Sequence, residues 1–202
     1  MPNAPLVKIK AATAEEVCVN FDLKKEAKPL LTNGMPPRAF LDALLGKKQY
    51  IAGIDFLCHA LAPRDAIWWG CLCLQHAMGN SLSDADKAAC KAAVRWIMAP
   101  TEENRAAAKA QADAAGPASP AGGLASAATF TGGSIGPPKA PPMPPPPFAP
   151  AKAVSGAIKL ATTKADPVKI AETQKLYLEL GIGIAEGRFS HADMRGMTAI
   201  RG

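Results

Sequence analysis

The chain has 202 residues, enough for one sizeable domain or two small ones, with one domain the more usual outcome. Its formal net charge is +6, but the excess of lysine and arginine is shared between the two ends and forms no dense basic run, which argues against nucleic-acid binding. The longest strongly apolar stretch, AIWWGCLCL, is about half as long as a membrane-spanning helix, so we expect no membrane partner.

The cysteines lie in apolar surroundings, and an odd number of them does not suit a complete set of disulfides. The first ten residues, MPNAPLVKIK, lack the basic-then-apolar pattern of a signal peptide. We therefore expect a soluble, cytoplasmic protein with reduced thiols at Cys18, Cys58, Cys71, Cys73 and Cys90.

The first third of the chain begins with residues 5–11, whose weak alternation of apolar and polar residues predicts a short extended segment. Thr13 and Glu16 then match a capping box, which predicts a helix over 14–22. Apolar residues at helical spacing predict the next two helices, over 36–46 and 48–61.

The middle of the chain predicts four further helices. The first, 63–78, is apolar on every side, so we expect it in the middle of the domain. Each of the other three helices begins after an N-cap residue. The last of these three helices is weakened by two adjacent glycines, each of which costs roughly 1 kcal/mol relative to alanine. The expected starts are Ser83 for 84–98, Thr101 for 102–115, and Ser119 for the weak helix.

Two helices are expected after the proline-rich stretch, over 151–163 and from Asp166 to about 186. No pair of strands is convincing, so the sequence predicts an all-α fold of about eight or nine helices in a single domain. We place an N-terminal extended segment and helix in 1–35, the helical domain in 36–188, and a flexible tail in 189–202.

The proline-rich stretch 136–150, GPPKAPPMPPPPFAP, admits three interpretations: a linker, a ligand for an SH3-like partner, or a rigid strut packed on the domain. We favour the strut, because the helices that follow are too few to form a core alone. As a polyproline II rod, residues 137–147 would span roughly 34 Å and cross one face of the domain.

Cys73, His76 and His59 form the densest group of metal-ligand types in the chain. Cys71 and Cys73 point about 160° apart on a helix and cannot grip one ion, so we expect no metal, no cofactor and no catalytic residue. An enzyme or effector that uses Cys73, His76 and perhaps His59 stays as an alternative hypothesis.

Several residues are candidates for contact with a partner protein. Two adjacent tryptophans diverge by 100°, so one fills the core and the other faces a second helix or a partner surface, although we favour core positions for both. The candidates are Pro138, Lys139, Pro141, Trp69 and Arg64.

Four stretches carry a resemblance to a known family: FLCHALAPRDAIWWGCLCLQ, WIMAPTEENRAAA, the passage from TFTGGSIGPP through PPMPPPPF to AVSGAIKLA, and YLELGIGIAEGR. Together, over residues 36–188, the chain resembles an uncharacterised family of bacterial domains of unknown function. Members of that family are often encoded near type VI secretion components, forkhead-associated proteins among them. The resemblance implies no catalytic residues, and it implies that the proline stretch recurs between the same two helices.

The sequence therefore favours a non-enzymatic adaptor or accessory protein that binds another protein, in a bacterial setting linked to type VI secretion. Its partner and its oligomeric state stay open, as does the alternative that the proline stretch is itself the ligand of an SH3-like module.

Overall fold

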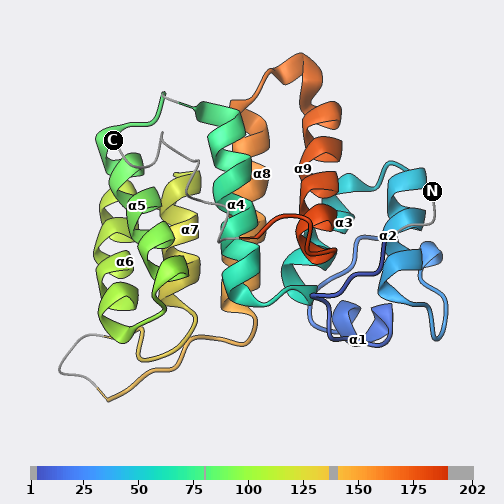
Figure 1. Cartoon of the computed structure of the whole chain (residues 1–202), viewed down its shortest axis with the longest axis horizontal. Helices are drawn as coiled ribbons and strands as arrows, with labels where there is room; N and C mark the ends of the chain where they lie inside the picture. The colour runs from blue at the N-terminus through green and yellow to red at the C-terminus, as the bar shows by residue number, and fades with distance from the viewer. Residues whose placement is uncertain (1–3, 80, 137–140, 191–202) are drawn as a thin grey trace.

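The computed structural model describes residues 4–79, 81–136 and 141–190, and these residues form helices and no strand (Figure 1). The all-α prediction is confirmed. The helices of the described part are α1 (Ala14–Cys18), α2 (Pro37–Gly46), α3 (Tyr50–Ala60), α4 (Pro63–Met78), α5 (Asp84–Met98), α6 (Glu102–Ala115), α7 (Pro120–Thr129), α8 (Ala149–Lys164) and α9 (Ile170–Ala185), with short 3-10 turns at Lys28–Leu30 and Pro167–Lys169.

Four of the expected N-caps are confirmed in atomic detail, since each hydroxyl accepts a hydrogen bond from a backbone N–H in the first turn of its helix. The pairs are Thr13 with Glu16, Ser83 with Asp86, Thr101 with Asn104, and Ser119 with Gly122. Such caps satisfy donors that have no partner within the helix, and this fixes where each helix begins.

The helices α4 to α8 stand side by side, with the remaining helices at one side of them (Figure 1). α7 contacts α4, α5, α6 and α8, so the helix with the weakest intrinsic propensity lies inside the bundle. α4 also lies in the interior, in contact with α5, α7, α8 and α9, as its all-round apolar character predicted.

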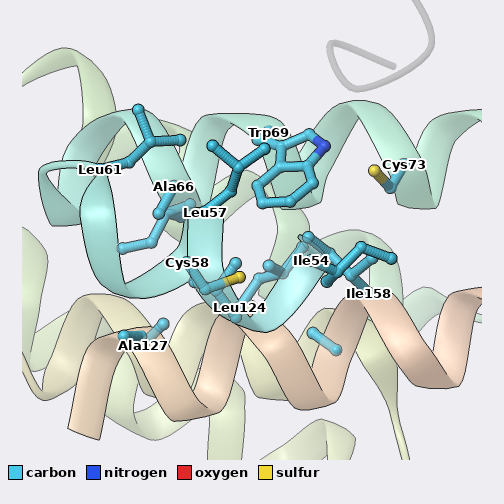
Figure 2. Packing of buried hydrophobic residues seen from close by; sticks show 14 of the residues in the cluster. Ile54, Leu57, Cys58, Leu61, Ala66, Trp69, Cys73, Leu124, Ala127 and Ile158 are labelled. Atoms are coloured by element: carbon cyan, nitrogen blue, oxygen red, sulfur yellow. The ribbon is translucent and has the colours of Figure 1, made fainter. Parts of the chain in front are cut away.

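The core around Trp69 joins α3, α4, α7 and α9, and Figure 2 shows Trp69 above Leu57 and Ile54. The Trp69 indole is fully buried, and its Nε1 donates to the Tyr177 carbonyl at 2.9 Å. Gly181 lies against the same ring, since a Cβ there would fall 2.6 Å from two Trp69 ring carbons. The missing side chain of Gly181 therefore allows α9 to pack closely against Trp69 of α4.

The N-terminal residues pack on the same body as the later helices. The Lys8 backbone N–H donates to the Ala185 carbonyl at 3.0 Å, and its ammonium pairs with Asp65 at 2.7 Å. The extended segment expected at 5–11 is wrong, because a turn closed by Ile9 N–H to Leu6 carbonyl interrupts it. The first helix is also shorter than expected and ends at Cys18.

Candidate functional site

The thiol and imidazole groups of the metal hypothesis differ in exposure and in hydrogen-bond partners. Cys73 is fully buried in α4, whereas His76 is exposed and its Nδ1 lies 3.3 Å from the Tyr177 hydroxyl. His59 lies on α3 and donates from Nδ1 to the Asp55 carbonyl at 2.7 Å. Among the described residues, no three histidine, cysteine or acidic side chains form a group able to hold a metal ion.

All five cysteines are free and buried. Burial raises the pKa of the Cys18 thiol to about 11 and that of Cys90 to about 12, with a further increase from the charges of Glu15 and Asp86 respectively. Burial also raises the pKa of the other three, Cys58, Cys71 and Cys73, well above the usual range. Because the thiolate is the nucleophile, these side chains are weak nucleophiles at neutral pH.

Two of the expected partner contacts have structural roles. Trp69 is 0% exposed, so its placement on a partner surface is wrong: the ring fills the gap that Gly181 leaves between α4 and α9. Arg64 is partly buried, and its guanidinium donates to the Ile97 carbonyl at 2.6 Å and the Met98 carbonyl at 3.5 Å. Arg64 therefore satisfies carbonyls at the end of α5, where a cation also favours the helix dipole.

The proline stretch does not run straight. Pro138 and Lys139 lie outside the described residues. The Ile135 N–H donates to the Met143 carbonyl at 2.8 Å, so these two residues lie side by side although they are eight positions apart. A straight rod that begins at residue 137 is therefore wrong, because it would carry Met143 away from Ile135. Figure 1 shows residues 141–148 beyond the ends of α6 and α7, leading to α8.

Residues 141–148, which we call the proline surface, are mostly exposed. Met143 is 56% exposed and Phe148 is 41% exposed, and Pro141 also faces solvent. Hydrogen bonds fix this segment at both ends: the Met143 N–H donates to Ser134 Oγ at 3.0 Å, and the Ala149 N–H donates to the Pro146 carbonyl at 3.1 Å. An apolar segment is thus held in place while its side chains face outward.

Arg105 supports the base of this loop. The side chain is buried, holds the Glu102 carboxylate through two bonds of 2.7 and 2.5 Å, and donates to the Thr129 carbonyl at 2.9 Å. Gly133, with φ of +65°, brings the backbone onto the guanidinium, and a Cβ there would lie 2.5 Å from Arg105 Nη2. The hydrogen bonds from Arg105 lower the pKa of Glu102, so the pair is charged at neutral pH.

A groove of about 740 Å³ runs between α6 and the returning loop. Its α6 side carries two ion pairs, Arg105 with Glu102 and Lys109 with Asp113, and its loop side includes Ile135 and Pro142. The proline surface and this groove therefore lie next to each other at one end of the bundle.

A polar cluster lies where α3 meets α8. Asp55 Oδ1 accepts from Lys159 Nζ at 2.5 Å and from the Ser155 hydroxyl, and His59 lies one turn further along α3. The His59 ring stacks on Phe21 with centroids 4.7 Å apart and contacts Phe148 at 6.0 Å. The cluster thus touches the proline surface at Phe148.

A family model for DUF6931, a family of unknown function, matches residues 40–185. The chain belongs to the DUF6931 family. Comparison with curated proteins and with solved structures found no match. The DUF6931 match extends from α2 to α9, so the proline surface lies inside the family's domain and between two of its helices. Within the described part of this DUF6931 protein, no helix is both long and apolar enough to cross a membrane.

Sequence reasoning missed Arg105 and the Asp55 cluster of this DUF6931 domain. The spacing of Asp55 and His59, and of Ser155 and Lys159, places each pair on one helix face, which is the only signal in the sequence that hints at the cluster. That α3 and α8 face each other is a tertiary fact, and nothing local to either helix predicts it.

Proposed function

We propose that this protein is a non-enzymatic adaptor that binds another protein through its proline surface, residues 141–148. The observation that carries the proposal is the exposure of Met143 and Phe148 on a segment whose two ends are fixed by hydrogen bonds. Exposed apolar side chains on an ordered segment are a common feature of docking sites.

The low conformational cost of binding supports this function. Prolines have one restricted backbone torsion each, and the tethers at Met143 and Ala149 already order the segment. Little backbone freedom is then left to lose when a partner binds. The two apolar side chains supply contact area, with the unbranched Met143 able to adapt to the shape of a partner.

The partner that fits best is a protein with a groove lined by aromatic side chains. Such grooves take proline rings between flat aromatic faces and need no donor from the ligand backbone, which matches a run of residues without N–H groups. Pro144, Pro146 and Pro147 are all exposed and available to such a groove.

The setting of this interaction also belongs to the proposal. The scattered cations favour a protein partner over nucleic acid. The resemblance to domains encoded near type VI secretion and forkhead-associated proteins supports a bacterial, secretion-linked role. Purified type VI secretion components from the same gene neighbourhood are therefore the first partners to assay.

The experiment compares two surface variants with the unaltered protein against each purified candidate. In the double variant Met143→Ser/Phe148→Asn, the exposed apolar contacts are lost, while asparagine accepts the left-handed backbone of residue 148. The control is Val168→Ser, because Val168 is 91% exposed and precedes α9, away from the proline surface. We expect calorimetry to show at least about tenfold weaker binding for the double variant alone.

Two results would contradict the proposal. Equal affinity of the double variant and the unaltered protein for a verified partner would place the contact elsewhere. Equal loss in the double variant and in Val168→Ser, with both still folded by circular dichroism, would point to a general loss of apolar surface instead of a defined site.

A further inference from the structure

His59 is held in one neutral tautomer. A carbonyl oxygen only accepts hydrogen bonds, so the 2.7 Å contact between His59 Nδ1 and the Asp55 carbonyl requires a proton on Nδ1. The lone pair then lies on Nε2, and this atom is buried without a hydrogen-bond partner. A buried nitrogen with no partner is tolerated in this tautomer, because a missing bond to a lone pair costs less than an unpaired charge.

Two aromatic rings contact the His59 ring. Phe21, from the segment after α1, stacks on it with an interplanar angle of 24°, and Phe148 contacts it with a tilt of 44°. Phe148 has φ of +58°, a left-handed conformation that is uncommon for a bulky residue. Neighbouring contacts must therefore hold Phe148 in place, and the His59 ring is one of them.

The charges around His59 oppose one another: the Asp55 carboxylate favours a second proton on the ring, and two lysines disfavour it. On α8, Lys152 and Lys159 both add positive charge near the ring. On α3, the opposing Asp55 carboxylate is already bound by Lys159 and Ser155. On the Phe21 side, Asp22 is almost fully solvated and pairs with Lys28 at 3.8 Å.

Burial is the main cause that lowers the pKa of His59 below 6.5, and the two lysines add to this effect, while the bond and charge of Asp55 oppose it. The pKa of His59 is therefore higher in the open state than in the closed state. The contact is at full strength above the unfolded pKa of about 6.5, and it weakens as the pH falls below that value because the open state binds the proton more tightly.

We propose that His59 is an acid-sensitive latch on the proline surface: the neutral ring holds Phe148 against α3, and the protonated ring turns out to solvent and releases it. Release frees the start of α8 and the tether at Pro146, so the proline surface loses its fixed shape. The consequence for partner binding rests on the proposed function, whereas the latch itself does not.

Hydrogen exchange of the full-length protein tests the latch without any partner. The probes are the Ala149 N–H, bonded to the Pro146 carbonyl, and the Lys152 N–H, bonded to the Phe148 carbonyl. Exchange is measured at pH 7.5 and pH 5.5 and corrected for the intrinsic pH dependence of amide exchange. Because the open state binds the proton more tightly than the closed state, local opening should increase at pH 5.5, by at most about tenfold for a group whose unfolded pKa is about 6.5.

The variants separate the latch from general acid effects. His59→Phe keeps a flat ring between the two phenylalanines and cannot titrate, so its protection should be the same at both pH values. His59→Gln serves as a second non-titrating variant if the first fails to fold. His76→Gln is the matched control, since His76 lies on α4 against Tyr177, and it should show the same acid response as the unaltered protein.

Three outcomes of the exchange experiment would contradict the latch. Equal protection at both pH values in the unaltered protein, or an unchanged acid response in both His59 variants, would overturn the latch. An equal loss of protection in α5 would show global unfolding and would also overturn it. Failure of the adaptor proposal is a separate result, because that is measured as partner affinity at pH 7.5, where the latch is closed.

Discussion

Trp69, inside α4, and Phe148, the N-cap of α8, are both large aromatic residues. Trp69 is fully buried, whereas Phe148 is 41% exposed. On the α9 side, the Trp69 indole packs against the Gly181 backbone and donates a hydrogen bond to the Tyr177 carbonyl. Around Phe148, contacts come from one imidazole ring and from a segment of prolines. The difference indicates that residues such as Trp69 stabilise the domain, whereas the proline surface is left exposed and is the part that we propose binds a partner.

The largest expected effect comes from adding one methyl group to the interior. In Gly181→Ala the new Cβ would lie 2.6 Å from the Trp69 ring and 3.0 Å from Leu57 Cδ1, so the packed helices must separate. We expect the free energy of unfolding to fall by about 2–3 kcal/mol, measured by urea denaturation.

Gly156→Ala is the matched control, because a Cβ at this helical position meets no atom within 4 Å. Replacing an unhindered helical glycine should raise stability by about 0.5–1 kcal/mol. If both variants changed stability in the same direction, the fit of Gly181 against Trp69 would not be the cause.

An intermediate effect is expected at the base of the proline surface. Arg105→Leu keeps the apolar bulk but leaves the Thr129 carbonyl without its side-chain donor and removes the support under Gly133. Thermal and urea denaturation should show a loss of about 1–2 kcal/mol. The control on the same helix, Lys109→Ala, breaks an exposed pair with Asp113 and should cost no more than about 0.5 kcal/mol. If Arg105→Leu and Lys109→Ala lost the same free energy of unfolding, Arg105 would contribute no more to stability than an exposed ion pair.

The smallest effect on stability is expected on the proline surface itself. Met143→Ser should change the free energy of unfolding by less than about 0.5 kcal/mol, because its side chain is already 56% exposed. The same variant should still weaken partner binding measurably. A loss of stability above 1 kcal/mol in denaturation experiments would show that Met143 belongs to the core and would remove the contrast with Trp69.

Helix starts were the best-predicted feature, and the reason is local chemistry. The ranges 84–98 and 102–115 are confirmed to the residue, since Ser83 and Thr101 bond to N–H groups only three positions away. Interactions over three residues depend on the adjacent sequence and on little else. The turn at residues 5–11 was missed because weak alternation carries little information in so short a segment.

The neighbours α6 and α7 show where local rules stop. α6 has the stronger helix-forming sequence, yet it lies at the edge with Ala106, Ala107 and Ala110 exposed. α7 starts with Pro120 and contains two glycines, yet it is almost entirely buried. Gly123 lets α7 approach α8, since a Cβ there would lie 3.1 Å from that of Ala157. Small residues that weaken an isolated helix can thus strengthen a packed one.

Contacts with residues distant in sequence explain the two wrong predictions at the candidate site. The straight rod over 137–147 followed from proline content, but the long-range bond from Ile135 to Met143 holds these two residues side by side. The partner role of Trp69 followed from adjacent tryptophans, but α9 covers that ring through Gly181. In both cases a residue distant in sequence decided the outcome.

By itself, the sequence determined an all-α protein, the starts of its capped helices, its buried apolar helix at 63–78 and its proline-rich interruption. These features depend on hydrogen bonds and apolar periodicity within a few residues. Only the tertiary structure decided which aromatic residue is covered, where Met143 of the proline stretch lies and which charges meet His59. These depend on contacts of α3 with α8 and of α4 with α9, which join residues about 100 positions apart in the chain, as in the bonds from Asp55 to Ser155 and from Trp69 to Tyr177.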